Sequence, residues 1–250
     1  NRRYEASDFW THSVFDLLYP GYTDCGSLHT EQGYTAPTPF GDAADVISSD
    51  VAPWVLRRYQ LVIVSSSLEF GPLEVKTKIE THLRAGGDVF ITGKQLATLP
   101  DGLLGMSASA CDILIPAGRV AISNDTVTEL RPWRACQLHL SSDSVPIATA
   151  GGRTVAARVE LKGGGRLVAV ASAHGVPAFP VSPPSGHSWS ENPYREDGSL
   201  ASPYPMLRFV HRLVSDLLNS TVLFEAGPGL SIIQNRRADG SYVLSVANGG

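Results

Sequence analysis

The chain has 250 residues, 43% of them hydrophobic and 18% charged, which suits one large globular domain, alone or with a small appendage. A formal net charge of −4 gives no electrostatic case for binding nucleic acid, and no run of Lys or Arg provides a local one. No apolar stretch approaches the roughly 20 residues that a membrane-spanning helix needs.

The predicted elements begin with a helix over residues 4–20, in which apolar residues recur at helical spacing and a Pro-Gly pair marks the end. Residues 21–41 follow as a long polar and aromatic loop. Loops of this length without secondary structure are usually functional or packed against a partner. A short helix over residues 51–59 then leads into the first strand.

Residues 58–96 predict a βαβ unit. Leu61–Val64 and Asp88–Thr92 are short apolar runs typical of buried strands. Between them, Gly71-Pro72 opens a helix and Ala85–Gly87 closes it. A single helix that joins two strands of one sheet places those strands parallel.

Residues 119–171 predict a series of β-hairpins, with turns at Gly151-Gly152 and Gly163–Gly165. The last of these strands, Arg166–Ala171, is an almost continuous apolar run, which is typical of a strand buried on both faces. The Gly163–Gly165 run is not interpreted as a phosphate-binding loop, because it does not open a helix.

The chain ends in a helix and a β-rich tail. After a Pro-, Ser- and Gly-rich loop at residues 175–203, Pro203–Leu218 predicts an amphipathic helix. We therefore expect an α/β domain over residues 1–220, with a mostly parallel, flavodoxin-like central sheet flanked by helices. Residues 221–250 are expected to begin a β-rich C-terminal module, and the chain to be a piece of a longer polypeptide.

The strand-to-helix turn at Gly93-Lys94-Gln95 is the first candidate for chemistry. Many α/β enzymes hold a nucleophile at such a turn, because the N–H groups of the following helix stabilise an oxyanion. The turn carries neither Cys nor Ser. Lys94 could bind an anion there, but a solvated lysine is the favoured interpretation.

The loop over residues 22–45 is the second candidate. Cys25 and His29 could act as nucleophile and base, although no strand-helix context lowers the thiol pKa. A metal site at Asp24, His29 and Glu31 is disfavoured by the absence of a tight ligand spacing. The same residues with Asp42 could instead line a polar ligand pocket. Residues that only cap turns are the favoured alternative.

Two residues of the second half complete the candidates. His174 follows the end of the predicted central strand, where a general base would sit, but no acidic partner stands at His-x-Glu spacing. Trp189 lies in the second long loop and could stack on a sugar. Neither a metal nor a cofactor is expected.

The cysteines and two N-glycosylation patterns indicate whether the protein is secreted. Cys25, Cys111 and Cys136 are too few for a disulfide framework. Isolated buried thiols are the favoured interpretation, and a Cys111–Cys136 bridge is the alternative for a secreted protein. Asn124 and Asn219 begin N-glycosylation acceptor patterns, which favour an extracellular or secreted protein.

With these residues placed, the chain resembles the class I glutamine-amidotransferase-like fold. It is more closely similar to the non-catalytic form of that fold, the middle (trimerisation) domain of family 42 β-galactosidases and related multidomain glycoside hydrolases. The resemblance covers about residues 5–220. It is carried by five segments: Thr38–Val46, Ser49–Tyr59, His82–Gly87, Asp88–Thr92 and Gly165–Ala171.

The resemblance implies a domain without catalysis of its own. The amidotransferase Gly-x-Cys-x-Gly elbow falls on residues 93–97, which read Gly-Lys-Gln-Leu-Ala, and the later His-x-Glu is replaced by Ala173-His174-Gly175. In the β-galactosidases this domain supports oligomerisation and closes one side of the active site, while the catalytic carboxylates lie on a separate barrel.

We therefore predict a non-catalytic accessory or oligomerisation domain of a larger carbohydrate-active or extracellular protein, partnered by the rest of that polypeptide or by further copies. One alternative is a hydrolase or lyase that acts on a carbohydrate through the loop at residues 24–45 and His174. A second alternative is a structural module whose long loops dock neighbouring subunits.

Overall fold

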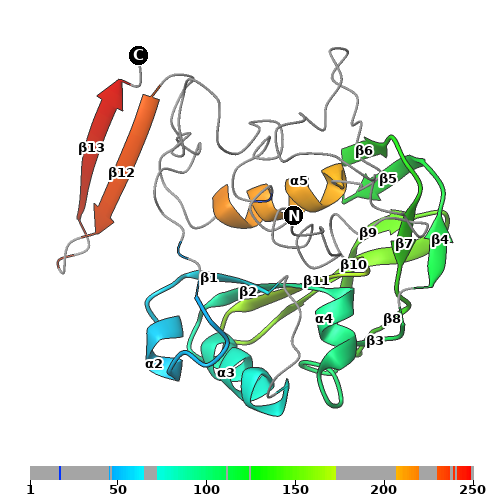
Figure 1. Cartoon of the computed structure of the whole chain (residues 1–250), viewed down its shortest axis with the longest axis horizontal. Helices are drawn as coiled ribbons and strands as arrows, with labels where there is room; N and C mark the ends of the chain where they lie inside the picture. The colour runs from blue at the N-terminus through cyan, green and yellow to red at the C-terminus, as the bar shows by residue number, and fades with distance from the viewer. Residues whose placement is uncertain are drawn as a thin grey trace, which may run out of the picture.

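The computed structural model describes residues 17, 45, 47–64, 72–110, 112–123, 125–172, 207–219, 230–236, 239 and 241–248 (Figure 1). Of the helix predicted over residues 4–20, only Leu17 lies within these ranges, and it is helical and buried. The two long loops predicted at residues 21–41 and 175–203 lie outside them. No helix within the described ranges is both long enough and apolar enough to cross a membrane.

The helices of the described ranges are α2 (Pro53–Leu56), α3 (Pro72–Arg84), α4 (Gly93–Thr98) and α5 (Arg208–Asn219). The strands are β1 (Leu61–Val64), β2 (Asp88–Thr92), β3 (Ser107–Ala108), β4 (Ile113–Ile115), β5 (Gly118–Ile122), β6 (Asp125–Glu129), β7 (Trp133–Ala135), β8 (Leu138–His139), β9 (Val145–Ala150), β10 (Arg153–Glu160), β11 (Arg166–Val170), β12 (Leu230–Arg236) and β13 (Tyr242–Asn248).

A mixed, seven-stranded sheet in the order β1-β2-β11-β10-β9-β5-β6 forms the centre of the fold. The predicted βαβ unit is confirmed, because β1 and β2 are parallel neighbours joined through α3. β11 also lies parallel to β2, in the central position that its apolar sequence predicted.

The prediction of a mostly parallel sheet holds only for the β1-β2-β11 side. The pairs β11-β10, β10-β9, β9-β5 and β5-β6 are all antiparallel. Short turns at Gly151-Gly152 and Gly163 join β9 to β10 and β10 to β11, and a turn this short can connect only antiparallel neighbours. The fold is α/β with a large mixed sheet and few helices.

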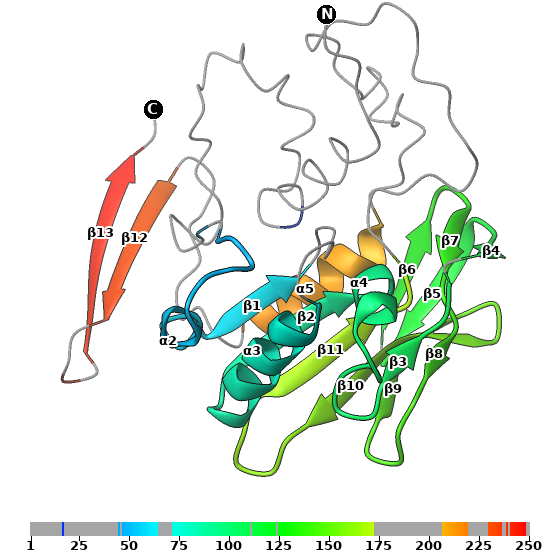
Figure 2. The ribbon, with the colours of Figure 1, turned by 60° about the horizontal axis from the view of Figure 1, so that its bottom comes forward.

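Helices lie on both faces of the sheet. Figures 1 and 2 show α3 and α4 against one face and α5 against the opposite face. α3 buries the stripe formed by Val75, Ile79 and Leu83, which recurs at helical spacing. α5 buries its own apolar stripe: Phe209, Val210, Leu213, Val214 and Leu217.

The core lies between these layers. All five residues of β2 are buried, as expected for a strand covered on both faces. Near the antiparallel half of the sheet, Trp133 of β7 is fully buried and packs on Phe209 of α5, with ring centroids 5.2 Å apart. This aromatic contact connects α5 to the strands that follow α4.

The glycine turn before β11 packs on the end of α3. The Gly165 N–H donates to the Leu83 carbonyl oxygen at 2.7 Å. A Cβ atom on Gly165 would stand only 1.7 Å from the Gly87 carbonyl oxygen, so two stretches of backbone approach more closely than any side chain permits. The glycine run is therefore a packing feature of the hairpin, in agreement with its interpretation as a turn.

The C-terminal strands β12 and β13 form an antiparallel hairpin over Leu230–Arg236 and Tyr242–Asn248. Within the described residues this hairpin pairs with no strand of the central sheet. Val243, Leu244 and Val246 are exposed. An isolated two-stranded hairpin is marginally stable at best, which suits the predicted β-rich module over residues 221–250, although the module itself stays a prediction.

Candidate functional site

The predicted strand-to-helix turn exists. β2 ends at Thr92 in an extended conformation, with φ −90° and ψ 155°, and α4 begins at the next residue. Gly93 is buried in this turn. A Cβ atom at position 93 would stand 2.8 Å from Sγ of Cys136 and 3.1 Å from the Val170 carbonyl oxygen. The space beside the turn is therefore already filled by protein atoms.

The turn carries neither Cys nor Ser. Gln95, which stands where the amidotransferase pattern places its cysteine, is 1% exposed. The Thr92 hydroxyl donates to its Oε1 atom. A buried, hydrogen-bonded carboxamide has no nucleophilic or basic character near neutral pH. Lys94 is exposed at the start of α4.

β7 and the residue that follows it bond to the chain at the carboxyl end of β11. The Cys136 N–H donates to the Ala171 carbonyl oxygen at 2.5 Å, and the Ser172 hydroxyl donates to the Arg134 carbonyl oxygen at 2.7 Å. Open parallel sheets usually bind ligands in a crevice at this edge. Here residues 134–136 bond directly to the edge beside β11.

The state of Cys136 differs from the prediction of isolated thiols. It is disulfide-bonded, so the interpretation of isolated thiols is wrong for this residue. The alternative partner, Cys111, lies outside the described residues. The sequence alone carried no signal for the position of Cys136 beside Gly93, because the two residues meet only through packing between β7 and the β2-α4 turn.

Most of the predicted site residues lie outside the part of the chain that the structure describes. Asp24, Cys25, His29, Glu31, Asp42, His174 and Trp189 all lie outside the described ranges. Their convergence in one pocket therefore stays a prediction. Among the residues that the structure does describe, no group of three or more His, Cys, Asp or Glu side chains could hold a metal ion.

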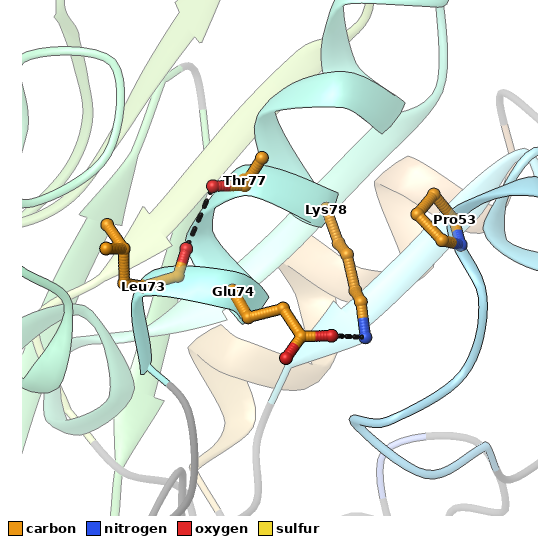
Figure 3. Close-up of a pocket in the computed structure, with 5 residues that line it drawn as sticks. All are labelled: Pro53, Leu73, Glu74, Thr77 and Lys78. Atoms are coloured by element: carbon orange, nitrogen blue, oxygen red, sulfur yellow. Dashed lines mark hydrogen bonds and ion pairs between the residues drawn. The ribbon is translucent and has the colours of Figure 1, made fainter.

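A second candidate site is a groove of about 590 Å³ beside α2 and the start of α3, lined by Pro53, Leu73, Glu74, Thr77 and Lys78 (Figure 3). The lining residues of α3 interact with each other: Lys78 Nζ lies 2.7 Å from a carboxylate oxygen of Glu74, and the Thr77 hydroxyl donates to the Leu73 carbonyl oxygen at 2.9 Å.

Large apolar side chains stand at this groove. Leu73 is 63% exposed, and Trp54, next to the groove on α2, is 54% exposed. The Arg58 guanidinium lies over the Trp54 ring, 4.9 Å from its centroid. Exposed apolar residues that gather at one place often mark a contact surface. We call Trp54, Leu73 and the groove the α2-α3 surface.

Two buried titratable groups lie away from both sites. Burial raises the pKa of Glu129, whose carboxylate accepts a hydrogen bond from the Phe209 N–H at 2.8 Å, at the start of α5. Burial lowers the pKa of His82, whose ring packs on Gly87. Glu129 therefore caps a helix, and His82 is a neutral core residue.

Comparisons with known proteins extend this description. No family model and no curated protein matches the chain. Among solved structures, a β-galactosidase from Bacillus circulans sp. alkalophilus aligns over 98% of this chain and 32% of its own, at 17% identity and a TM-score of 0.56. A cold-adapted β-galactosidase from Rahnella sp. R3 aligns over 78% and 28%, at 18% identity and a TM-score of 0.47.

The chain thus spans about a third of the length of the first of these β-galactosidases. At such low identity a structural likeness shows the fold alone, and neither substrate nor activity follows from it. The chain shares its fold with one part of a larger β-galactosidase chain.

Proposed function

We propose that this chain is a non-catalytic accessory domain of a larger, extracellular carbohydrate-active protein, in which it serves assembly. The observation that carries the proposal is the filled strand-to-helix turn. Gly93 is enclosed by Cys136 and Val170, and the following Gln95 is buried. A side chain at either position would therefore meet protein atoms and not an open cleft.

The filled turn argues against catalysis by this edge of the sheet. Covalent catalysis needs an activated nucleophile next to preorganised N–H donors, with room for the reacting group about 3 Å away. A cysteine introduced at position 95 would have its thiol at a buried position, where it is inert. We infer that the βαβ unit serves as a scaffold.

The carbohydrate context is supported by the fold. A β-galactosidase of roughly three times the length contains a part with this fold. A chain that corresponds to one part of a larger glycosidase is expected to work together with the rest of such a protein. The resemblance found in the sequence leads to the same proposal.

The α2-α3 surface supports a role in assembly. Leu73 exposes a large apolar side chain at the groove, and Trp54 exposes another next to Pro53, which lines the groove. Tryptophan with a nearby arginine is the composition typical of interface hot spots. Burying such a side chain contributes about 2 kcal/mol. We propose that this surface contacts another folded unit, either a further copy or another part of the same protein.

An extracellular location is supported by two described residues. The disulfide at Cys136 is of a kind that persists in oxidising compartments. Asn219, which begins one glycosylation pattern, is exposed at the end of α5. An oligosaccharide transferase could therefore reach it. The alternative function, a hydrolase or lyase acting through residues 24–45 and His174, depends on residues outside the described ranges.

Sedimentation velocity tests the assembly role. The double variant Trp54→Ser, Leu73→Ser is compared with the wild-type chain and with Leu130→Ser. Leu130 is 61% exposed but does not line the α2-α3 groove, which makes it a matched control. We expect the wild type and Leu130→Ser to associate with rising concentration and the double variant to stay monomeric. A wild-type chain that is monomeric both alone and with the remainder of its parent protein would contradict the role.

A further inference from the structure

A charged groove of about 570 Å³ lies between α5 and the sheet, far along the chain from the strand-to-helix turn. Its apolar walls include Ile147, Val168 and Leu213. Three arginines and two aspartates complete its lining: Arg158, Arg166, Arg212, Asp125 and Asp216. We propose that this groove binds a small organic anion, a carboxylate or phosphate group carried on an apolar body.

The register of the sheet brings two of the arginines together. Glu160 of β10 pairs with Arg166 of β11, and Arg158 pairs with Val168. Residues two apart on a strand share a face, so Arg158 and Arg166 stand diagonally on the same face of neighbouring strands. α5 covers this face and contributes Arg212. Three guanidinium groups from three elements thus line one groove.

Arg166 is positioned in advance by a buried carboxylate. The Asp88 side chain is 3% exposed and accepts from the Arg166 backbone N–H at 2.8 Å and from Nη2 at 2.5 Å. Asp88 itself does not line the groove. A guanidinium held by a carboxylate on one side is preorganised, which lowers the entropy lost when it binds a ligand.

The other two arginines hold exchangeable partners. Arg158 Nε lies 3.1 Å from Glu160, and Arg212 pairs with Asp125 at 3.2 Å and Asp216 at 3.1 Å. All these side chains are about half exposed. Exposed ion pairs contribute only about 0–1 kcal/mol, so an anionic ligand can take the place of a carboxylate on either arginine.

The rest of the groove defines the ligand. Arginine forks match the oxygens of carboxylates and phosphates, whereas isoleucine, valine and leucine walls favour contact with a hydrocarbon or ring. The volume of about 570 Å³ admits a ligand the size of a common metabolite. The occupant is thus an anion with an apolar body. This proposal is independent of the accessory role, because the groove lies apart from the α2-α3 surface.

Isothermal titration of the 250-residue chain at low salt tests the proposal. The probes are benzoate, phenyl phosphate, neutral benzyl alcohol and inorganic phosphate. We expect benzoate or phenyl phosphate to bind with a Kd on the order of 1 mM, at least about 10-fold tighter than benzyl alcohol and inorganic phosphate. Comparing benzoate with phenyl phosphate shows which anionic group the groove prefers.

Two substitutions that are expected to change the affinity in opposite directions make the test specific. Arg158→Gln should weaken binding about 10-fold, whereas Asp216→Asn should strengthen it by about 3-fold, because it removes a carboxylate that competes for Arg212. Arg119→Gln removes an exposed arginine that does not line the groove and should change nothing.

Thermal unfolding of each variant separates loss of binding from loss of folding. Three results would overturn the proposal: no anion binding up to about 20 mM, equal binding of benzyl alcohol, or shifts in the same direction for the Arg158 and Asp216 variants.

Discussion

Replacing Gly165 by alanine is expected to be far more harmful than the same replacement at Gly163, two residues away. A Cβ atom on Gly165 would stand 1.7 Å from the Gly87 carbonyl oxygen, which no rotation of a side chain can relieve. A Cβ atom on Gly163 would meet nothing within 4 Å, but Gly163 has φ +70°. Gly165→Ala therefore measures the effect of a steric clash with the backbone, and Gly163→Ala measures the cost of placing alanine at a positive φ.

The magnitudes follow from these contacts. To accept Gly165→Ala, the turn must move off the end of α3. It then loses the bond from the Gly165 N–H to Leu83, at 2.7 Å, and weakens the bond from the Leu161 N–H to the Gly165 oxygen, at 3.1 Å. At about 1 kcal/mol for each bond, with lost packing in addition, we expect a loss of about 3 kcal/mol. Gly163→Ala should cost about 1 kcal/mol, the usual penalty for a left-handed alanine.

Urea unfolding followed by tryptophan fluorescence measures both variants. In a parallel thermal unfolding experiment, a loss of about 3 kcal/mol corresponds to a fall in Tm of roughly 6–12 °C for a chain of this size, against roughly 2–4 °C for the control variant Gly163→Ala. Equal unfolding free energies for Gly165→Ala and Gly163→Ala would refute the reasoning, because they would mean that the turn does not pack on α3 as described.

Three further substitutions test the buried charges. Asp88→Asn removes the charge that faces Arg166, and we expect the free energy of unfolding in urea to fall by about 2–3 kcal/mol. This loss is smaller than for a fully buried ion pair because Arg166 is 31% exposed. An unchanged free energy of unfolding would show that the pair contributes nothing. Burial raises the pKa of Glu129 above its ordinary 4.5, so the folded state holds its proton more tightly and wild-type stability should fall as pH rises from 4.5 through the raised value. Glu129→Gln should remove that fall in a series of Tm measurements, and a fall of the same size in the variant would contradict the assignment. Burial lowers the pKa of His82 below 6.5, so stability should decline as pH drops below 6.5 towards the lowered value, and His82→Gln should abolish this decline in the same series; a decline that persists would place its origin elsewhere.

Local sequence signals predicted the parallel half of the sheet well. β1, α3 and β2 each carry their own pattern, and one helix between two apolar strands leaves little choice of topology. β11 was likewise found from its apolar run. The antiparallel half was predicted only as separate hairpins. Local sequence patterns predict each hairpin but not which sheet it joins, because that depends on pairing between strands distant in the chain. β11 belongs to both halves, being parallel to β2 and antiparallel to β10.

The sites were harder to predict for the same reason. That Lys94 and Gln95 stand at the turn in place of Cys or Ser is a local property of the sequence, and the structure describes both residues. That Cys136 fills the space beside Gly93 depends on packing between residues 43 positions apart. The arginines of the α5 groove come from β10, β11 and α5, and no spacing along the chain joins them.

The central claim is that this domain contributes no catalytic group at its strand-to-helix turn. The most direct measurement is kcat/KM of the larger carbohydrate-active protein that we propose carries this chain, with Lys94→Ala compared with Lys162→Ala, an exposed lysine in the turn before β11. We predict that both variants stay within about twofold of the wild type. A loss of about 100-fold or more in Lys94→Ala alone, with unchanged thermal stability, would contradict the claim.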